Sequence, residues 1–189
     1  MTEHAFRMVY RTCVKAISKI HVMTFCCGKH AMRLTVYTDY ALRLLMYLAV
    51  KDDGLATISE VAESYGISKN HLMKVAHQLG VAGYVDSVRG RAGGLRLAKS
   101  IAMINLGDVV RYTEPDMALV PCFTPESASC AIFSSCALRG VLSGARDAFL
   151  SVLDRHTLAD LVRSRAPLRK LLAFKPDSRA VRQRPASRG

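Results

Sequence analysis

Residues 57–97 read TISEVAESYGISKNHLMKVAHQLGVAGYVDSVRGRAGGLRL. The first part of this stretch predicts two helices joined by a tight turn. Thr57 and Glu60 have the spacing of a capping box, in which the hydroxyl accepts the amide three residues on and the carboxylate reaches back. Gly66 suits the left-handed turn that ends a helix, and Ser68 is expected to cap the next one. The apolar residues of that second helix share one face, at Leu72, Val75, Ala76 and Leu79.

A hairpin is expected after the helix pair. Residues 84–88 alternate between apolar and polar side chains, as a half-buried strand does, and residues 95–97 alternate again. The glycines of the intervening segment 89–94 would weaken any helix or strand, so this segment is expected to be a loop. The predicted fold is therefore mainly α with a small β-hairpin wing, that is, a winged helix-turn-helix with a long C-terminal dimerisation helix.

The flanking segments contain further helix signals. Residues 38–50 have apolar residues at helical spacing, and Asp52-Asp53-Gly54 is expected to close that helix. Asn105 is expected to cap a short helix that runs through Arg111 and is stopped by Pro115.

A long helix is expected from Ala137, followed by a short one that opens at Thr157 and ends near Pro167. The apolar stripe of the long helix exceeds what a small winged helix needs for its own core. A dimer interface is the natural use for the surplus. The stripe consists of Leu138, Val141, Leu142, Ala145, Phe149, Val152 and Leu153.

These signals divide the chain into five expected segments. They are an extension over 1–31 that is poorly ordered or a start-site artefact, a winged-helix DNA-binding domain over 32–114, a cysteine loop over 115–136, dimerisation helices over 137–168, and a mostly disordered basic tail over 169–189. No run of about eighteen apolar residues occurs, so no membrane span is expected.

The net charge of +12 is concentrated at the two ends of the chain, with +4 over residues 1–31 and +6 over residues 169–189. Within the nearly neutral remainder, residues 68–99 hold six basic residues against Asp86 alone. A local basic patch of this kind indicates a binding face for a polyanion better than the total charge does.

The basic patch falls on both elements with which a winged helix contacts DNA. The expected reading residues are Ser68, Lys69, Asn70, His71 and Lys74 on the second helix, and Arg89 and Arg91 on the wing. Asn70 suits adenine, the two lysines suit phosphate or guanine, and the arginines suit a narrow minor groove. The alternative is a solvated basic face on a winged helix that binds another protein.

Three cysteines, Cys122, Cys130 and Cys136, lie in one loop directly before the long helix. Their spacing is not that of a zinc finger, but three thiolates near a helix N-terminus suit soft-metal ligation by iron–sulfur or zinc, with one position left to fill. The alternatives are ordinary small apolar residues or a thiol pair that oxidises. The absence of a secretory signal favours a reducing, cytoplasmic setting. Cys13, Cys26 and Cys27 receive no role.

Residues 32–174 resemble the bacterial winged-helix repressors of the iron–sulfur regulator family that includes IscR and the nitric-oxide sensor NsrR. The similar stretches are MRLT (32–35), TDYALR (38–43), YGISKNHL (65–72), VRGRAGG (88–94) and TLADL (157–161). Arg139 lies where IscR-like members have a ligand histidine, which favours the NsrR type, a nitric-oxide-sensing transcriptional repressor.

The resemblance implies a homodimer with one iron–sulfur cluster per subunit, either 2Fe–2S or 4Fe–4S. It implies that Cys122, Cys130 and Cys136 hold the cluster, and that Asp39 of the partner's first helix is the fourth ligand. Taken alone, Asp39 has an ordinary explanation, because an acid suits the first turn of a helix.

The expected function is transcriptional repression. The dimer is expected to bind operator DNA and to be released from it when nitric oxide nitrosylates the cluster. The alternative is an iron–sulfur or thiol redox-responsive regulator of the same fold with a different signal and regulon. An enzyme with a cysteine nucleophile is not expected, because no histidine lies between His77 and His156 to act as its base.

Overall fold

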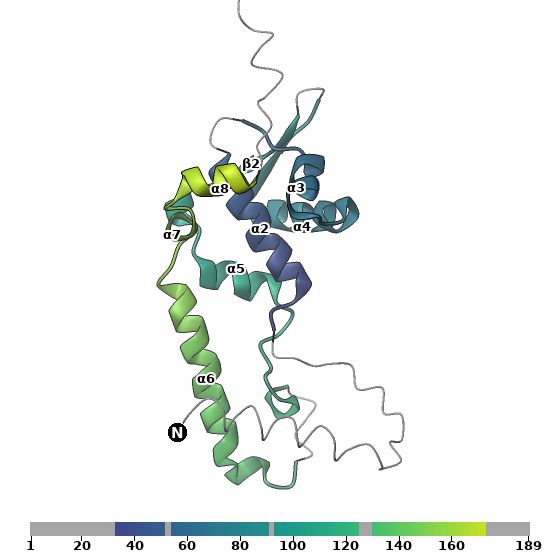
Figure 1. The fold of residues 1–189 in the computed structure, drawn as a ribbon. Helices are drawn as coiled ribbons and strands as arrows, with labels where there is room; N and C mark the ends of the chain where they lie inside the picture. Colours follow the sequence, from purple (N-terminus) through teal and green to yellow (C-terminus); the bar gives the residue numbers. More distant parts are fainter. Residues whose placement is uncertain (1–32, 52–53, 91–92, 125–129, 173–189) are drawn as a thin grey trace, which may run out of the picture. The chain divides into compact units, whose positions relative to one another are not determined.

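The computed structural model describes residues 33–51, 54–90, 93–124 and 130–172. The chain divides into two units, 1–32 and 33–189, and every described residue belongs to the second. The main elements (Figure 1) are α2 (Val36–Val50), α3 (Ile58–Tyr65), α4 (Lys69–Val81), β1 (Val85–Val88), β2 (Gly94–Leu97), α5 (Leu106–Thr113), α6 (Ala137–Asp154), α7 (Leu158–Leu161) and α8 (Arg165–Leu171), with short 3-10 turns η1 (Ile101–Met103), η2 (Pro121–Phe123) and η4 (Phe133–Ser135). The expected extension 1–31, Asp52, Asp53 and Arg91 lie outside the described residues.

The helix-turn-helix consists of α3 and α4. The predicted capping box is present, because the Thr57 amide donates to Glu60 Oε2 at 2.6 Å and the Glu60 amide donates to Thr57 Oγ1 at 3.2 Å. Gly66 has the predicted left-handed backbone, with φ 64°. The expected cap by Ser68 is wrong in one respect: Ser68 occupies the N-cap position, but its side chain makes no capping hydrogen bond. Ser68 is exposed, and water can satisfy the amides of an exposed first turn.

The wing is an antiparallel hairpin in which Val85 pairs with Leu97 and Val88 pairs with Gly94. The expected half-buried alternation is wrong for β1, because only Val85 is buried in that strand. Leu95 of β2 is buried and forms an isolated bridge with Ala56. The base of the hairpin therefore packs on the core, and its outer half is surrounded by solvent.

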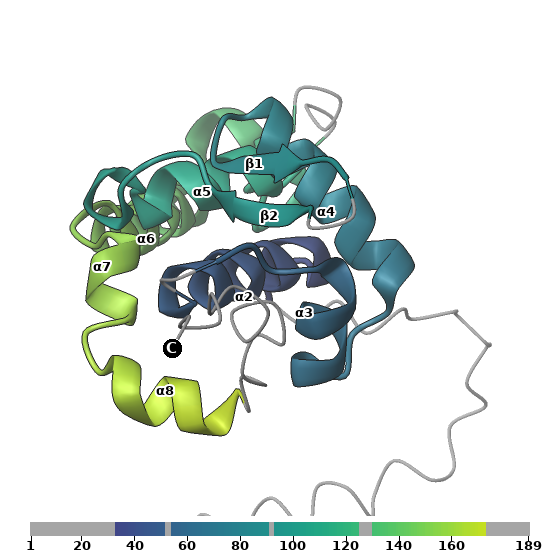
Figure 2. The same cartoon turned by 90° about the horizontal axis from the view of Figure 1, so that it is seen from above.

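The hydrophobic core is built around α2, which contacts α4, α5, α7, α8 and β2 (Figure 2). Several large side chains in this core are fully buried, among them Leu44, Leu45, Leu72, Leu79, Val109 and Leu158. Their burial holds α4 at a fixed angle on α2, so the polar face of α4 is presented by a rigid element rather than by a loop.

The C-terminal helices differ from the expected pattern. Pro167 does not end a helix; it lies in the first turn of α8, where the missing amide has no helical partner to lose. Helix α8 therefore enters the segment 169–189 that was expected to be a basic tail. Leu172 just after it is buried, and its carbonyl accepts a hydrogen bond from Ser64 Oγ at 3.1 Å. Helix α5 ends at Thr113, two residues later than expected.

The Glu60 carboxylate makes the capping box sensitive to pH. Burial raises its pKa, but the hydrogen bonds from the Thr57 amide and Lys51 outweigh burial and hold the pKa below its ordinary value of 4.5. A lowered folded-state pKa adds stability above the unfolded-state pKa, and this contribution is lost as the pH falls through the folded-state value. Glu60→Gln should therefore lose less stability than wild type as the pH falls from neutral through 4.5 and below.

Urea unfolding followed by circular dichroism measures this difference. Glu63→Gln, on the same helix and away from the cap, is the matched control. Parallel pH profiles for wild type and Glu60→Gln would contradict the prediction.

Candidate functional site

The N-terminal half of α4 presents polar side chains to solvent. The predicted reading residues Ser68, Lys69, Asn70, His71 and Lys74 are all exposed. The opposite face is buried through Leu72, Val75, Ala76 and Leu79. The helix is thus anchored by its apolar face, with its first turns open to a large ligand.

The basic residues of segment 68–99 separate into two groups. Arg96 pairs with Asp86 across the hairpin at 3.3 Å, and the Lys99 ammonium lies 4.9 Å from the centre of the Tyr84 ring. No ion pair forms at Lys69, Lys74 or exposed Arg89 within the described part of the chain. The unpaired positive charge therefore lies on the recognition helix and the wing, the two elements that contact DNA in a winged helix.

A contact between aromatic rings joins the reading face to α2. The Tyr40 and His71 rings lie 6.2 Å apart, centre to centre. Tyr40 directly follows Asp39, so the recognition helix touches the residue beside the expected partner ligand. Nothing in the sequence pattern predicted this contact, because the two residues belong to helices that are distant in sequence.

Asp39 lies on the surface of α2. Its Oδ1 accepts a hydrogen bond from Arg43 Nε at 2.9 Å, and its side chain is 45% exposed. The Arg43 guanidinium also lies 5.7 Å from the centre of the Tyr65 ring. Exposed ion pairs of this kind are weak, so the Asp39 carboxylate is accessible to another chain at small cost.

The three loop cysteines are free thiols, and one of them adjoins the start of α6. Cys122 is in η2, Cys136 is the N-cap residue of α6, and Cys130 is exposed. Within the described residues, no three His, Cys, Asp or Glu side chains are grouped so that they could hold a metal ion.

The donor set nevertheless fits an iron–sulfur group in its chemistry, because such clusters are held mainly by cysteine thiolates. Three thiols come from one loop, and a carboxylate from a second subunit would supply the remaining oxygen ligand. The described residues do not gather three such ligands, so binding a cluster would require the loop to close around it.

Helix α6 has no buried residue. Its apolar stripe is open to solvent, with Leu138 63%, Val141 68%, Phe149 42% and Val152 47% exposed. Within the described chain, α6 packs against α5. A stripe of this length that covers no core of its own is typical of a protein-binding face.

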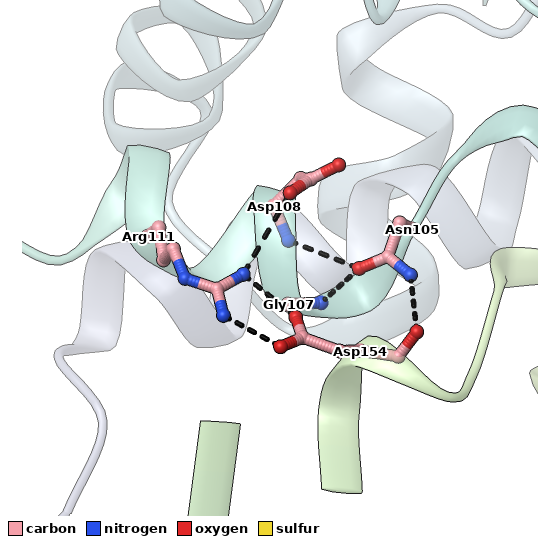
Figure 3. A network of polar contacts seen from close by, with 5 residues as sticks. All are labelled: Asn105, Gly107, Asp108, Arg111 and Asp154. Carbon is pink, nitrogen blue, oxygen red and sulfur yellow. Dashed lines mark hydrogen bonds and ion pairs between the residues drawn. The ribbon is translucent and has the colours of Figure 1, made fainter. Parts of the chain in front are cut away.

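A polar joint fastens the end of α6 to α5 (Figure 3). Arg111 donates from both Nη atoms to the two Asp154 carboxylate oxygens, each at 2.7 Å, and Asn105 Nδ2 donates to the Asp154 carbonyl at 2.7 Å. Asn105 Oδ1 also accepts from the Gly107 amide at 2.8 Å, which confirms the predicted cap of α5. A Cβ at Gly107 would collide with the Asp154 carboxylate, so any larger residue there would displace Asp154 from this joint.

Asp154→Asn is expected to loosen this joint. The bidentate Arg111 contact lowers the pKa of Asp154 and raises that of Arg111, which shows that the charged pair is favoured. The pair is exposed, so we expect a small fall in Tm together with faster amide exchange in the last turn of α6 and the first turn of α5. Asp147→Asn, which removes a charge elsewhere on α6, is the control. Unchanged exchange at the joint would contradict the prediction.

The anchored α4, its open polar face and the hairpin wing define a winged-helix DNA-binding protein. Residues 34–164 match the Rrf2 family of iron-dependent transcriptional regulators, and the chain belongs to this family.

The relatives support the same assignment. The transcriptional regulator NsrR of Bacillus licheniformis is 50% identical over 143 residues, covering 75% of this chain and 100% of the relative. NsrR of Bacillus subtilis is 50% identical over 145 residues, covering 76% of this chain and 99% of the relative.

Solved structures of similar fold include two regulators. CymR, the global cysteine regulator of B. subtilis, has a TM-score of 0.58 at 28% identity and covers 70% of this chain and 98% of its own. IscR of T. potens has a TM-score of 0.57 at 26% identity, and the match covers 72% of this chain and 90% of IscR.

The expected fold class and the resemblance to NsrR are therefore confirmed, and the chain is a non-enzymatic, DNA-binding transcriptional regulator. The structure describes no helix with the length and apolar character that crossing a membrane requires.

Proposed function

We propose that this chain is a cytoplasmic, nitric-oxide-sensing repressor that binds operator DNA as a homodimer and is released when its iron–sulfur cluster is nitrosylated. The observation that supports this most is the position of the three-thiol loop. The loop leads directly into α6, whose exposed apolar stripe suits a second subunit.

In this proposal each subunit places α4 in the major groove. Asn70 bonds adenine, Lys69 and Lys74 contact phosphate or guanine, and Ser68 and His71 lie beside them at the start of the helix. Arg89 and Arg91 reach a minor groove from the wing. The exposure of the α4 residues and of Arg89 supports these roles.

Two α6 helices pair through their apolar stripes, which brings the cysteine loop of one subunit near α2 of the other. Cys122, Cys130 and Cys136 would then hold a 2Fe–2S or 4Fe–4S cluster, and the partner's Asp39 would complete the ligand set. The bound cluster supplies iron to which nitric oxide binds strongly.

The ion pair between Asp39 and Arg43 suggests how the signal reaches DNA. When Asp39 binds in the partner's site, it loses its contact with Arg43. When Asp39 is released, it pairs again with Arg43, at 2.9 Å. Tyr40 moves with Asp39 and touches His71 of the recognition helix. A change at Asp39 is thereby transmitted to the face that reads DNA.

A second candidate is a cluster-free thiol switch, or another redox-responsive regulator of this fold with a different regulon. The free thiols of Cys122, Cys130 and Cys136, which are half-buried or exposed, favour this candidate. In that case oxidation of the thiols, rather than loss of iron, would alter DNA binding.

Anaerobic purification with iron and sulfide quantified, followed by a nitric-oxide titration, tests the proposal. A sensor should contain both elements and show visible absorbance that nitric oxide changes together with DNA binding. Colourless protein whose DNA affinity responds to a thiol oxidant alone would favour the thiol switch. If iron-loaded protein had the same DNA affinity with and without nitric oxide, nitric oxide would be excluded as the signal.

A further inference from the structure

Two arginines of α6 lie over the rings of two phenylalanines from the cysteine loop. The Arg139 guanidinium carbon is 4.5 Å from the centre of the Phe133 ring, and that of Arg146 is 5.3 Å from the centre of the Phe123 ring. Both distances lie within the range of cation–π attraction, about 6 Å.

The two contacts hold the loop close to its cysteines. Phe123 directly follows Cys122, and Phe133 lies between Cys130 and Cys136. Backbone hydrogen bonds here are local, since the amides of Phe123 and Phe133 donate to residues three positions earlier, each at 3.0 Å. These bonds shape the turns η2 and η4, whereas the two stacked pairs attach the turns to α6.

The spacing of the arginines places both contacts on one side of α6. Residues 139 and 146 are seven positions apart, which is close to two helical turns. At about 100° per residue, both lie within about 80° of Phe149, at one edge of the exposed apolar stripe, and Val141 lies at the opposite edge. The loop is therefore held along the edge of the expected dimer face.

The two arginines differ in their surroundings. Arg146 is 30% exposed and is oriented by Asp147 Oδ1, at 2.9 Å from Nη2, and by Ser143 Oγ, at 3.3 Å. Arg139 makes no ion pair in the described part of the chain, and its positive charge lies beside the loop. A ligand set of three thiolates and a carboxylate is negatively charged, and a nearby cation offsets part of that charge.

We propose that Arg139 and Arg146 are positioning residues, which clamp the cysteine loop onto α6 through Phe133 and Phe123 and keep the thiols beside this helix, where the loop would close around the cluster. The part that concerns cluster retention rests on the proposed function. The clamp involves only residues of this chain, so it is testable separately in iron-free protein.

Hydrogen exchange of the iron-free protein tests the clamp. In Arg139→Gln/Arg146→Gln, amides of residues 120–124 and 130–136 should exchange about tenfold faster than in wild type, since each exposed pair contributes modestly. The variant Phe123→Leu/Phe133→Leu keeps both arginines and should show the same faster exchange of these amides. Arg155→Gln at the far end of α6 is the matched control. Exchange equal to wild type in both double variants would overturn the clamp.

Cluster loss to an iron chelator tests the link to the site. The arginine double variant should lose iron about tenfold faster than wild type and Arg155→Gln. Lysine at both positions, which keeps charge but loses the planar stack, should give an intermediate rate. Equal rates in all variants would overturn this part. Wild-type protein that binds no iron but shows clamp-dependent exchange would support the clamp and contradict the proposed function.

Discussion

Cys136→Ser is expected to abolish iron binding and the response to nitric oxide without unfolding the chain. Cys136 is the N-cap residue of α6, where its side chain makes no capping hydrogen bond. Serine is a favoured N-cap residue, so α6 should keep or gain stability. A serine hydroxyl is a poor substitute for a soft thiolate ligand, and two remaining thiols cannot hold the cluster.

Iron and sulfide per chain, visible absorbance and the circular dichroism spectrum measure this result. Cys27→Ser, in the segment 1–32 to which no role is assigned, is the matched control and should retain the metal. A Cys136→Ser protein with full iron content would contradict the assignment of the loop as the cluster site. Loss of helicity in the variant would instead contradict the reasoning about the cap.

Lys69→Ala/Lys74→Ala is expected to weaken DNA binding by about tenfold to about a hundredfold at moderate salt. Both lysines are exposed on α4 and form no ion pair in the described chain. The slope of log affinity against log salt concentration changes by about one unit for each phosphate that a lysine neutralises. Loss of both lysines should therefore reduce the magnitude of this slope by about two.

A duplex selected by the protein from a random-sequence library is the probe, and the affinity is measured over a range of salt concentrations. Lys99→Ala is the matched control, because Lys99 is not part of α4 and its ammonium lies over the Tyr84 ring. A larger loss for Lys99→Ala than for the α4 variant would contradict the assignment of α4 as the recognition helix.

Local signals in the sequence predicted much of the fold. The capping box of Thr57, the left-handed Gly66 and the cap by Asn105 each depend on residues within three positions of one another, so their chemistry is visible in the sequence. The pair Asp39–Arg43 was not predicted, although it has the i,i+4 spacing that a helix brings together. The exposed stripe of α6 followed from periodicity alone.

Features that depend on distant parts of the chain were missed or wrong. Pro167 can end a helix or lie in its first turn, and the packing of α8 decides which. The exposure of Val88 depends on how far the hairpin extends beyond the core. The joint between Arg111 and Asp154 spans 43 residues and has no pattern in the sequence.

The cysteine site was predictable only in part. Soft ligands in one loop are visible in the sequence, but the expected fourth ligand, Asp39, rests on the resemblance, because it would come from another subunit. The arginine–phenylalanine pairs that hold the loop were not predicted. Stacking of this kind requires the path of the loop over α6, which no local rule specifies.

The most direct test of the central claim is the affinity of one anaerobic, cluster-loaded preparation for its selected duplex, measured before and after stoichiometric nitric oxide. The account predicts tight binding before the addition and a fall of at least about tenfold after it, with Cys136→Ser unresponsive. Equal affinity before and after the addition, in protein whose visible absorbance shows that nitric oxide has reacted, would contradict it.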